Sequence, residues 1–318
     1  MKSSVKVVAI GEAVVEIFRK YPDQSFDKIA DFVGPFPSGA PAIFADTLAK
    51  LGCPVGFVGP VGKDEFGRCI LKKLKEDGVD IGQMIILPDC TTGTAFTTYF
   101  SNGRRKFLYH MKDAAPGRFS PEHIKEDYFS QVEFLHITGN VLAISDSSRK
   151  ACHKAANLVK KEGGKISFDP NLRPELLSIR EIRALCDPFV KMADILLPGE
   201  EELKVLAGTR DLKKATEEFI GRGIHIIAIK QGKRGSMIFT PHTRLYIPPF
   251  EVEEIDPTGA GDCYDAGFIF GLLKGWELEK IGKFSNAVGA LAVTKRGGME
   301  GLSSLSQVID FMRERENN

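Results

Sequence analysis

The chain has 318 residues and a formal net charge of +1, because 43 Lys and Arg side chains almost balance 42 Asp and Glu side chains. This balance argues against a protein that binds nucleic acid over a broad surface, since such proteins are usually strongly basic. With 43% hydrophobic and 27% charged residues, the composition is that of a globular protein with a large core. Its 32 glycines amount to about a tenth of the chain, against roughly 7% in an average protein.

Cysteine, histidine and apolar patterns exclude several further classes of protein. The six cysteines are scattered, without a C-x-x-C pair or zinc-ligand spacing, and predict reduced thiols in a cytoplasmic protein. The six histidines show no H-E-x-x-H or similar spacing, so we expect no histidine-based metal site. The sequence shows neither a signal-peptide pattern nor a run of 18 uncharged apolar residues, and we expect no membrane association.

Short apolar runs and helix-like patterns alternate along the chain. The predicted buried strands are Val5–Ile10, Val55–Val58, Phe134–Ile137, Lys165–Phe168, Ile195–Leu197 and Ile224–Ile229. The predicted helices are Ala42–Leu51, Glu65–Glu76, Ser147–Lys161, Glu200–Leu206 and Leu212–Arg222. Because parallel strands need crossover helices, the alternation predicts an α/β fold, a three-layer αβα sandwich around a mostly parallel central sheet.

Two further runs do not fit this alternation. Val14–Phe18 and Thr94–Tyr109 are rich in β-branched and aromatic residues, and no crossover helices lie within them. We expect a small antiparallel β-sheet here, a lid built from segments near residues 12–40 and 91–112. No linker rich in Pro, Gly and Ser divides the chain, so residues 1–318 are predicted to be one domain whose lid closes over a site.

The most informative segment is the glycine loop Asp256-Pro257-Thr258-Gly259-Ala260-Gly261-Asp262, which precedes the apolar helix Ala266–Leu273. Two glycines at the start of a helix let backbone N–H groups converge on an anion, and the helix dipole favours negative charge there. Asp262 follows directly and can accept a proton from a hydroxyl that attacks phosphorus. An isolated G-x-G-D is also compatible with a tight turn and a helix-capping aspartate. The chain contains neither a Walker loop nor a G-x-G-x-x-G dinucleotide loop.

The longer run that begins at Asp256, D-P-T-G-A-G-D-C-Y-D-A-G-F-I, resembles the second signature of the ribokinase-like (PfkB) carbohydrate kinases. Those enzymes transfer the γ-phosphoryl group of ATP to a hydroxyl of a sugar or nucleoside. The resemblance implies the ribokinase-like fold and makes Asp262 the catalytic base. It also implies an anion hole of Gly259, Ala260 and Gly261, and places Thr258, Gly259 and Gly261 beside the nucleotide.

The N-terminal half resembles the family's first signature, G-G-A-P-A-N-x-A, at Ser38-Gly39-Ala40-Pro41-Ala42-Ile43-Phe44-Ala45. Ser38 replaces a glycine, and Ile43 replaces the asparagine that hydrogen-bonds a sugar hydroxyl in relatives. Loss of that amide is expected to change which sugar binds, because a site's polar groups select the hydroxyls it accepts. By the same resemblance Glu16, Gly34, Ser38 and Gly39 would lie beside the sugar. Glu16 is also compatible with a surface position on a lid strand.

Two loops in the middle of the chain extend the resemblance. Asp169-Pro170-Asn171-Leu172-Arg173 is similar to the D-x-N-x-R run of fructokinase-like and 2-keto-3-deoxygluconate kinase-like members, in which Asn171 and Arg173 would bind substrate. Arg173 is also compatible with an ion pair inside a loop. Pro198-Gly199-Glu200-Glu201-Glu202 is similar to the family's N-x-x-E element, with Gly199 in place of the asparagine. Glu202 would organise magnesium through water, or the three glutamates would only favour the first turn of a helix.

The nucleotide is expected at a sharp turn and near the C-terminal end of the chain. Lys230-Gln231-Gly232-Lys233-Arg234-Gly235 ends a strand and turns, so Gly232 and Gly235 would let ATP approach the backbone. Asn286 would begin a wall of the adenine pocket that extends to Gly298. The implied cofactors are ATP and Mg²⁺, and the family resemblance adds a monovalent cation such as K⁺ near Asp256 as an option.

The sequence thus predicts ATP-dependent phosphorylation of a small carbohydrate, a ketohexose such as fructose or tagatose, or 2-keto-3-deoxygluconate. Relatives that handle fructose or 2-keto-3-deoxygluconate often carry an arginine where Met111 falls, and this departure leaves the sugar open. The basic lid segment 104–111 is compatible with an acidic or phosphorylated substrate, or with a solvated hairpin turn. The alternatives are a nucleoside kinase of the same fold and a non-catalytic sugar-binding regulator. The expected partners are the sugar, ATP and a second copy of the chain that pairs through the lid.

Overall fold

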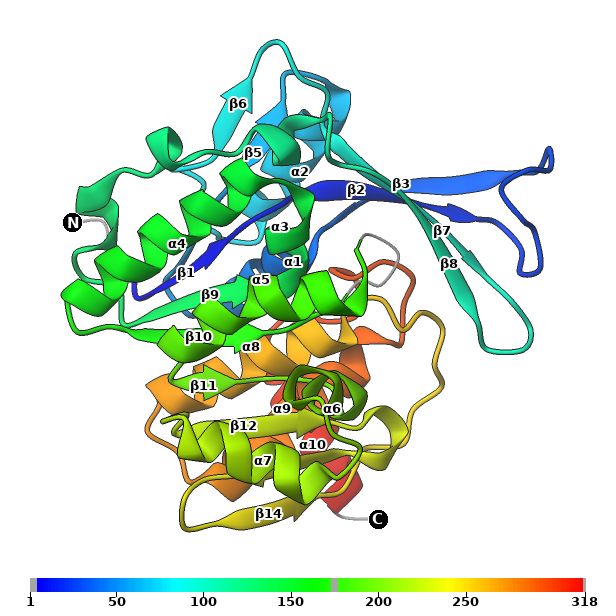
Figure 1. Cartoon of the computed structure of the whole chain (residues 1–318). Coiled ribbons are helices and arrows are strands. Elements are labelled where there is room, and N and C mark those ends of the chain that lie inside the picture. Colours follow the sequence, from blue (N-terminus) through cyan, green and yellow to red (C-terminus); the bar gives the residue numbers. More distant parts are fainter. Residues whose placement is uncertain (1–4, 173–176, 317–318) are drawn as a thin grey trace.

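In the computed structural model, which describes residues 5–172 and 177–316, an eight-stranded sheet forms the centre of the molecule (Figure 1). Its strand order is β14-β13-β12-β11-β10-β9-β1-β4. The strands are β1 Val7–Ile10, β4 Val55–Val58, β9 Phe134–Thr138, β10 Lys165–Asp169, β11 Ile195–Leu196, β12 Ile226–Lys230, β13 Ser236–Phe239 and β14 Arg244–Ile247. The strands from β4 to β12 pair in parallel, and β13 and β14 add antiparallel partners at one edge. The predicted mostly parallel sheet is confirmed.

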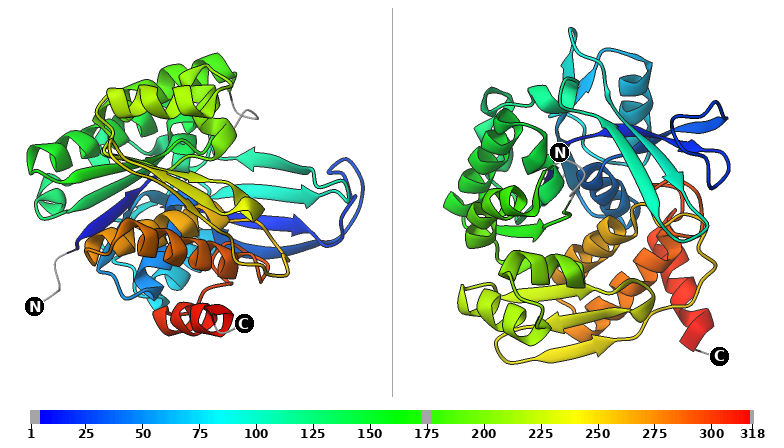
Figure 2. Two further views of the ribbon diagram at one scale, coloured as in Figure 1. Left: turned by 90° about the horizontal axis from the view of Figure 1, so that it is seen from below. Right: turned by 45° about the vertical axis from the view of Figure 1, so that its right-hand side comes forward.

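Helices cover both faces of this sheet, as the turned views show (Figure 2). One face packs against α1 Ala40–Lys50, α2 Glu65–Glu76, α8 Ala260–Leu273, α9 Leu278–Ala292 and α10 Leu305–Glu316. The other face packs against α3 Gly139–Ile144, α4 Asp146–Lys161, α5 Ile179–Met192, α6 Glu200–Ala207 and α7 Leu212–Gly221. The predicted three-layer αβα arrangement is therefore observed.

Alternate residues of the central strands enter two separate cores. In β1, Val7 and Ala9 belong to the core that contains α1 and α8, whereas Val8 and Ile10 belong to the core that contains α4 and α7. Successive side chains of a strand point to opposite faces, and both faces of a parallel sheet are covered. This double burial explains why the strands are continuous apolar runs in the sequence.

A separate four-stranded sheet, the lid, projects beside the carboxyl ends of the central strands (Figure 1). Its strand order is β3-β2-β7-β8, with β2 Val14–Arg19, β3 Phe32–Ser38, β7 Gly93–Tyr99 and β8 Arg105–His110. Two antiparallel hairpins, β2–β3 and β7–β8, lie side by side, but β2 and β7 pair in parallel, with Val14 opposite Gly93. The expectation of a purely antiparallel lid is wrong at this pair. The intervening segment, which contains α1, β4 and α2, brings the chain back to the end of the lid where β2 begins. Strand β7 therefore runs in the same direction as β2.

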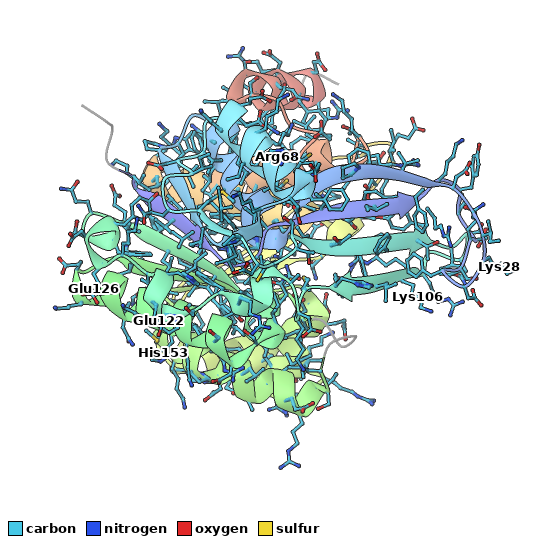
Figure 3. The ribbon with its side chains drawn as sticks, turned by 90° about the horizontal axis from the view of Figure 1, so that it is seen from above. Lys28, Arg68, Lys106, Glu122, Glu126 and His153 are labelled. Atoms are coloured by element: carbon cyan, nitrogen blue, oxygen red, sulfur yellow. The ribbon has the colours of Figure 1, made fainter. Side chains whose placement is uncertain are left out.

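Shorter elements complete the described chain. Strands β5 Pro60–Gly62 and β6 Ile85–Leu87 pair in parallel, and 3₁₀ turns occur at Ala115–Arg118, Pro121–His123, Glu126–Phe129 and Gly232–Arg234. Lys28 and Lys106 mark the end of the lid that is remote from the body (Figure 3). Within residues 5–172 and 177–316, no helix combines the length and the apolar character needed to cross a membrane.

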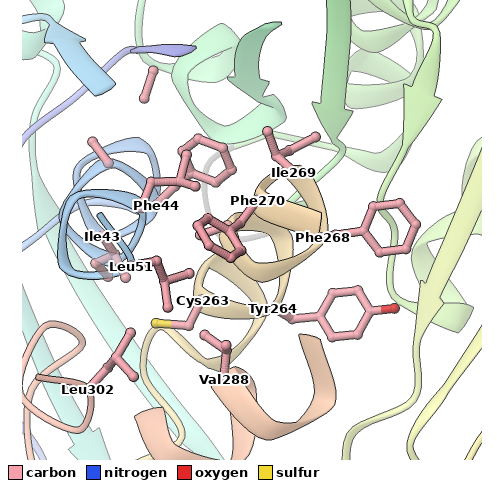
Figure 4. Close-up of a cluster of buried hydrophobic side chains, with 14 of the residues drawn as sticks. Ile43, Phe44, Leu51, Cys263, Tyr264, Phe268, Ile269, Phe270, Val288 and Leu302 are labelled. Atoms are coloured by element: carbon pink, nitrogen blue, oxygen red, sulfur yellow. The ribbon is translucent and has the colours of Figure 1, made fainter. Parts of the chain in front are cut away.

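Helix α8 is buried around most of its circumference, which fixes the loop that precedes it. Phe268 and Phe270 point to different sides of this helix, and both are almost completely buried (Figure 4). A helix that is apolar all round needs neighbours on every side. Helices α1 and α9 supply two of them. The position of the glycine loop is therefore set by the core.

Candidate active site

Two cavities flank the glycine loop at the carboxyl ends of the central strands. The smaller one, about 80 Å³, lies between the lid and the body, and we call it the lid cavity. The larger one, about 500 Å³, is lined by α8, α9 and the turn after β12, and we call it the helix cavity. Gly259 and Asp262 line the lid cavity, whereas Ala260 and Gly261 line the helix cavity. The glycine loop is thus the boundary between the two cavities.

Replacement of Gly259 by any other residue would require a change in the conformation of the loop. Its φ of +80° is left-handed, and a Cβ placed there would lie 2.9 Å from Gly298 Cα and 3.0 Å from Gly298 O. Helix α8 begins at the next residue. The first N–H groups of a helix have no acceptor within it and carry partial positive charge. The family resemblance makes these N–H groups the anion site, and the backbone nitrogen of Ala260 lies 3.4 Å from Pro257 O in this structure.

Asp262 lies in the first turn of α8, where it is mostly buried and lines the lid cavity. Asn171 Nδ2 lies 3.4 Å from Asp262 Oδ1. The backbone N–H of Asn171 donates to Asp169 Oδ1 at 3.1 Å and thereby holds this loop in place. Asn171 itself has a left-handed φ of 38°. Arg173, the other residue expected in this loop, lies outside the described residues. The structure brings Asn171 and Asp262 together, although they are far apart in the sequence.

Three of the four residues expected beside the sugar line the lid cavity, namely Glu16, Ser38 and Gly39. Gly39 has a φ of +106°, and a Cβ there would lie 2.7 Å from Glu12 O, so this position needs glycine. Gly34 is not brought to the cavity. It lies four residues before Ser38 and further out on β3, where a Cβ would lie 2.9 Å from Glu16 O.

Glu16 is a buried acid that faces the lid cavity. Ser38 Oγ donates to Glu16 Oε2 at 3.0 Å, and Thr97 Oγ1 donates to Glu16 Oε1. Burial raises the pKa of Glu16 to about 7, although these two hydrogen bonds and the charge of Arg105 favour the ionised form. The surface alternative for Glu16 is excluded, because its side chain is 3% exposed.

Of the positions that depart from the family pattern, Ser38, Ile43 and Met111 line the lid cavity, whereas Gly199 does not. Ile43 packs against the glycine loop, since a Cβ on Gly298 would lie 2.5 Å from Ile43 Cδ1 and one on Gly259 would lie 3.1 Å from Ile43 Cγ2. An apolar side chain at residue 43 therefore fills space beside the anion-binding loop. It offers no hydrogen bond to a sugar hydroxyl.

Three side chains of the lid cavity were not selected from the sequence as site residues. Asn140 at the start of α3 donates from Nδ2 to Glu12 Oε1, and both residues line the cavity. Arg105 is the one cationic side chain among the described residues that line it, and its guanidinium lies 5.3 Å from the centre of the Phe107 ring. Glu12 and Asn140 lie just after the buried strands β1 and β9, and this position is the signal that could have found them, because ligands bind at the carboxyl ends of parallel strands.

The lid is joined to the glycine loop by a hydrogen-bonded pair. Tyr99 on β7 donates its hydroxyl to Asp256 Oδ1 at 2.5 Å and lies 2.9 Å from Thr258 Oγ1. Asp256 is fully buried and also accepts the N–H groups of Thr258 at 3.0 Å and Gly297 at 2.8 Å. Thr258 was expected beside the nucleotide, but the structure places it in the lining of the lid cavity.

Gly259, also expected beside the nucleotide, lines the lid cavity, and the helix cavity contains the remaining four residues of that prediction. Gly232, Gly235, Gly261 and Asn286 line it, together with apolar side chains such as Phe250. Asn286 Nδ2 donates to Ile247 O at 3.2 Å and to Pro248 O at 2.8 Å. Its amide nitrogen therefore holds the wall of the cavity in place.

Glu202 has a structural role at the start of α6, where the sequence allowed such a role as the alternative to magnesium binding. Its Oε2 accepts the N–H of Gly199 at 2.7 Å, and its Oε1 accepts the N–H of Leu172 at 2.8 Å. Glu202 thus caps α6 and holds the loop after β10. Burial and the charge of Asp169 raise the pKa of Glu202. Among the described residues, no group of three or more His, Cys, Asp or Glu side chains is arranged to hold a metal ion.

Comparison with known proteins agrees with this geometry. A family profile described as pfkB family carbohydrate kinase matches residues 4–305. The chain is 29% identical to Fructokinase-1 of Oryza sativa subsp. japonica, over 96% of this chain and 97% of that protein. It is 30% identical to 2-dehydro-3-deoxygluconokinase of Bacillus subtilis (strain 168), over 86% of each.

A solved structure of an E. coli protein provisionally named Ribokinase II, in complex with ATP and Mg²⁺, is 39% identical. It superposes with a TM-score of 0.92 and covers 98% of this chain and 99% of that chain. The family profile spans nearly the whole chain. This protein belongs to the pfkB family of carbohydrate kinases.

Proposed function

We propose that residues 1–318 form one catalytic domain that phosphorylates a hydroxyl of a small carbohydrate with ATP. The observation that carries the proposal is the position of the glycine loop between a small polar cavity and a larger one. In such an arrangement a sugar in the lid cavity and a nucleotide in the helix cavity would meet at the loop. Phosphoryl transfer needs this meeting of two substrates and little covalent chemistry from the protein.

Asp262 is the proposed general base. Its carboxylate lines the lid cavity and would accept the proton of the attacking hydroxyl, while Asn171 orients it. The N–H groups at the start of α8 would stabilise the charge that develops on the transferred phosphoryl group. The lid would exclude water, so that a sugar hydroxyl attacks in place of a water molecule.

The proposed substrates are a ketohexose, such as fructose or tagatose, or 2-keto-3-deoxygluconate. Glu12, Glu16 and Asn140 offer acceptors for hydroxyl groups, and Arg105 offers a guanidinium to a carboxylate. The two curated relatives are named as a fructokinase and a 2-dehydro-3-deoxygluconokinase, which supports both classes. The proposed partners are therefore ATP and a small sugar.

An ADP-release screen with ATP and a panel of sugars tests this function. The panel contains ketoses, aldoses, sugar acids, sugar phosphates and nucleosides, including fructose and adenosine. Turnover with a ketose or a sugar acid supports the proposal, and turnover with adenosine alone would identify a nucleoside kinase. Binding of a sugar without ADP release across the whole panel would identify a non-catalytic regulator.

Magnesium and a monovalent cation are the proposed ions. Carboxylate oxygens suit Mg²⁺, and Glu202, whose two oxygens already accept N–H groups, would reach the ion through water. Magnesium supplies charge neutralisation on the phosphate oxygens of ATP. The buried Asp256 carboxylate is the residue beside which K⁺ is proposed. Loss of turnover on chelation, restored by Mg²⁺, tests the first ion, and comparison of K⁺ with Na⁺ buffers tests the second.

The outer face of the lid is proposed to pair with a second copy of the chain. Phe32 and Leu108 are 43% and 44% exposed there, and Phe96 lies beside Phe32 with ring centres 5.5 Å apart. An exposed apolar sheet face is a typical site of association. A Leu108→Glu variant is expected to sediment as a monomer, whereas Tyr246→Glu on β14 leaves a dimer intact. A wild-type protein that sediments as a monomer contradicts the pairing.

A further inference from the structure

Lys230 is buried at the boundary between the helix cavity and the elements that hold Asp262. It is the last residue of β12, and its side chain is 14% exposed. Its Nζ lies 2.9 Å from Asp169 Oδ2 and 3.0 Å from both oxygens of Asp265. Breaking such a buried arrangement leaves an unpaired charge, so each of the three groups constrains the other two.

The ammonium group of Lys230 also reaches the glycine loop. Lys230 lines the helix cavity together with Ala260 and Gly261. A Cβ placed on Gly261 would lie 3.4 Å from Lys230 Nζ. The ammonium therefore lies against the first turn of α8, beside the main chain that separates the two cavities.

Both carboxylates that Lys230 contacts are connected to Asp262. Asp265 follows Asp262 by three residues on α8, and residues with this spacing are neighbours on a helix surface. Asp169 accepts the N–H of Asn171, and Asn171 Nδ2 lies 3.4 Å from Asp262 Oδ1. Lys230 thus joins α8 to the loop after β10, the two elements that hold the Asp262 carboxylate.

Positive charge is scarce around these carboxylates. Among the described residues, Lys230 is the cation within ion-pair distance of Asp169 and Asp265. Glu202 on α6 faces the same group, and His136 on β9 contributes no charge because burial lowers its pKa to about 3. Burial opposes the charged form of Lys230, but the charges of Asp169 and Asp265 outweigh it and raise its pKa. Lys230 is therefore charged in this structure.

We propose that Lys230 is a positioning residue for phosphoryl transfer, which bridges Asp169 and Asp265 and thereby orients the Asp262 carboxylate toward the attacking hydroxyl. This role rests on the proposed function, since it depends on Asp262 as the base. Because the effect passes through Asp262, it is expected in kcat and not in the KM values. A displacement of about 1 Å at a reacting group can lower a rate by about 10²-fold.

The experiment compares Lys230→Met with Lys50→Met in steady-state kinetics. Lys50 is a matched control, because it is also buried and contacts two aspartates, with Nζ 2.7 Å from Asp46 Oδ2 and 3.3 Å from Asp77 Oδ2. Lys50 lines neither cavity. We expect Lys230→Met to lower kcat about 10²-fold with both KM values within about threefold of wild type. We expect Lys50→Met to lower the melting temperature to a similar degree but to keep kcat within about threefold.

Two further variants separate positioning from folding. Lys230→Arg keeps the charge and is expected to recover kcat to within about tenfold of wild type, since guanidinium also pairs with carboxylates. Asp265→Asn weakens one half of the bridge, because an amide nitrogen replaces one of the two oxygens that lie 3.0 Å from Lys230 Nζ. This variant is expected to fold and to lower kcat about tenfold with unchanged KM. If Lys230→Met does not fold, the kcat of Asp265→Asn tests the positioning role instead.

Three results would overturn the inference: kcat of Lys230→Met or Asp265→Asn near that of wild type, an equal loss of kcat in Lys50→Met, or a change confined to the KM for ATP. The last would make Lys230 a phosphate-binding group. These results leave the proposed function standing, because the wild-type enzyme is active in each case. A wild type that turns over no sugar refutes the function and this role together.

Discussion

The lid cavity and the helix cavity are built from different parts of the chain. Side chains dominate the lid cavity, which is lined by the buried carboxylates Glu12, Glu16 and Asp262. Main-chain turns and apolar side chains dominate the helix cavity, where Gly232 and Phe250 are examples. Polar side chains select particular hydroxyls, whereas main-chain N–H groups bind anions of any origin. This difference explains why the reaction can be inferred from the sequence, whereas the identity of the sugar depends on the side chains of the lid cavity.

Substitution has different consequences in the two regions. Ile43 and Met111 line the lid cavity at positions where the family resemblance predicts polar residues. Gly259 allows no such exchange, because its φ of +80° and its contact with Gly298 both require glycine. Specificity can therefore vary in this fold while the anion-binding loop stays the same.

The largest expected effect is that of Asp262→Asn. Removal of the proposed base is expected to lower kcat by about 10²–10⁴-fold, the usual contribution of general base catalysis. ATP binding is expected to stay unchanged, because Asp262 lines the lid cavity and not the helix cavity. Steady-state kinetics and calorimetric titration with ATP measure the two effects. A kcat within tenfold of wild type would refute the assignment.

The next effect concerns the glycine loop and compares Gly259→Ala with Gly163→Ala, a control that lines neither cavity. Both positions are left-handed, with φ of +80° and +81°, so each alanine costs about 1–2 kcal/mol of backbone strain. A Cβ on Gly163 meets no atom within 4 Å, whereas one on Gly259 meets Gly298. We expect kcat/KM to fall about 10²-fold in Gly259→Ala and less than about fivefold in Gly163→Ala. Equal losses would show that strain alone, and not displacement of the loop, lowers the rate.

The third effect is a pH dependence that comes from Glu16. Its pKa is about 7 in the folded protein, against 4.5 as the ordinary value. The folded state therefore holds this proton more tightly, and the associated stability is present below about pH 4.5 and lost as the pH rises through about 7. At about 1.4 kcal/mol for each pH unit, the loss is at most about 3.5 kcal/mol.

Thermal unfolding between pH 5 and 8 measures this loss. The Glu16→Gln variant is expected to show a flatter profile, because glutamine does not titrate. Glu65→Gln on the exposed start of α2 is the control, since the pKa of Glu65 is lowered and this group stays ionised over the interval. Parallel profiles for wild type and Glu16→Gln would show that another group titrates in this range.

The smallest expected effect concerns the connection between the two regions. Tyr99→Phe removes the hydroxyl that the lid donates to Asp256, while the N–H groups of Thr258 and Gly297 still satisfy this carboxylate. A hydrogen bond to a charged group contributes about 1.5–3 kcal/mol, and the remaining donors reduce the loss. We expect the KM for the sugar to rise about three- to tenfold with little change in kcat. Tyr246→Phe is the control, and identical KM values in both variants would exclude a role of this contact in lid closure.

Several elements could be located from the sequence because local pattern decides them. Helix α2 has the expected range, Glu65–Glu76, and β4 has the expected range, Val55–Val58. The apolar periodicity of α2 reflects burial on one face, and the continuous run of buried residues in β4 reflects burial on both faces. Strands β13 and β14 escaped prediction because Ser236–Phe239 and Arg244–Ile247 are only four residues long, too short for an apolar periodicity to be recognised.

The lid shows where local pattern is not sufficient. Its strands were expected near the right positions, but their pairing depends on how residues 39–92 return the chain, which no local pattern describes. The same holds for Asn140, which is an ordinary polar residue in the sequence. The sequence connects the segments of Arg105 and Lys230 with the substrates, but the groups that these two side chains contact are set only by their neighbours in space.

The sequence by itself determined the α/β class and the glycine loop, because these depend on strand burial and on backbone conformations that require glycine at fixed spacing. Its resemblance to the PfkB signatures indicated the reaction. Tertiary structure alone decided that Gly259 and Asp262 face one cavity while Ala260 and Gly261 face the other. It also decided that Lys230 joins Asp169 to Asp265. The physical reason is that charge pairing and cavity lining act between residues that are distant in the chain, and their energies depend on burial that only the folded protein provides.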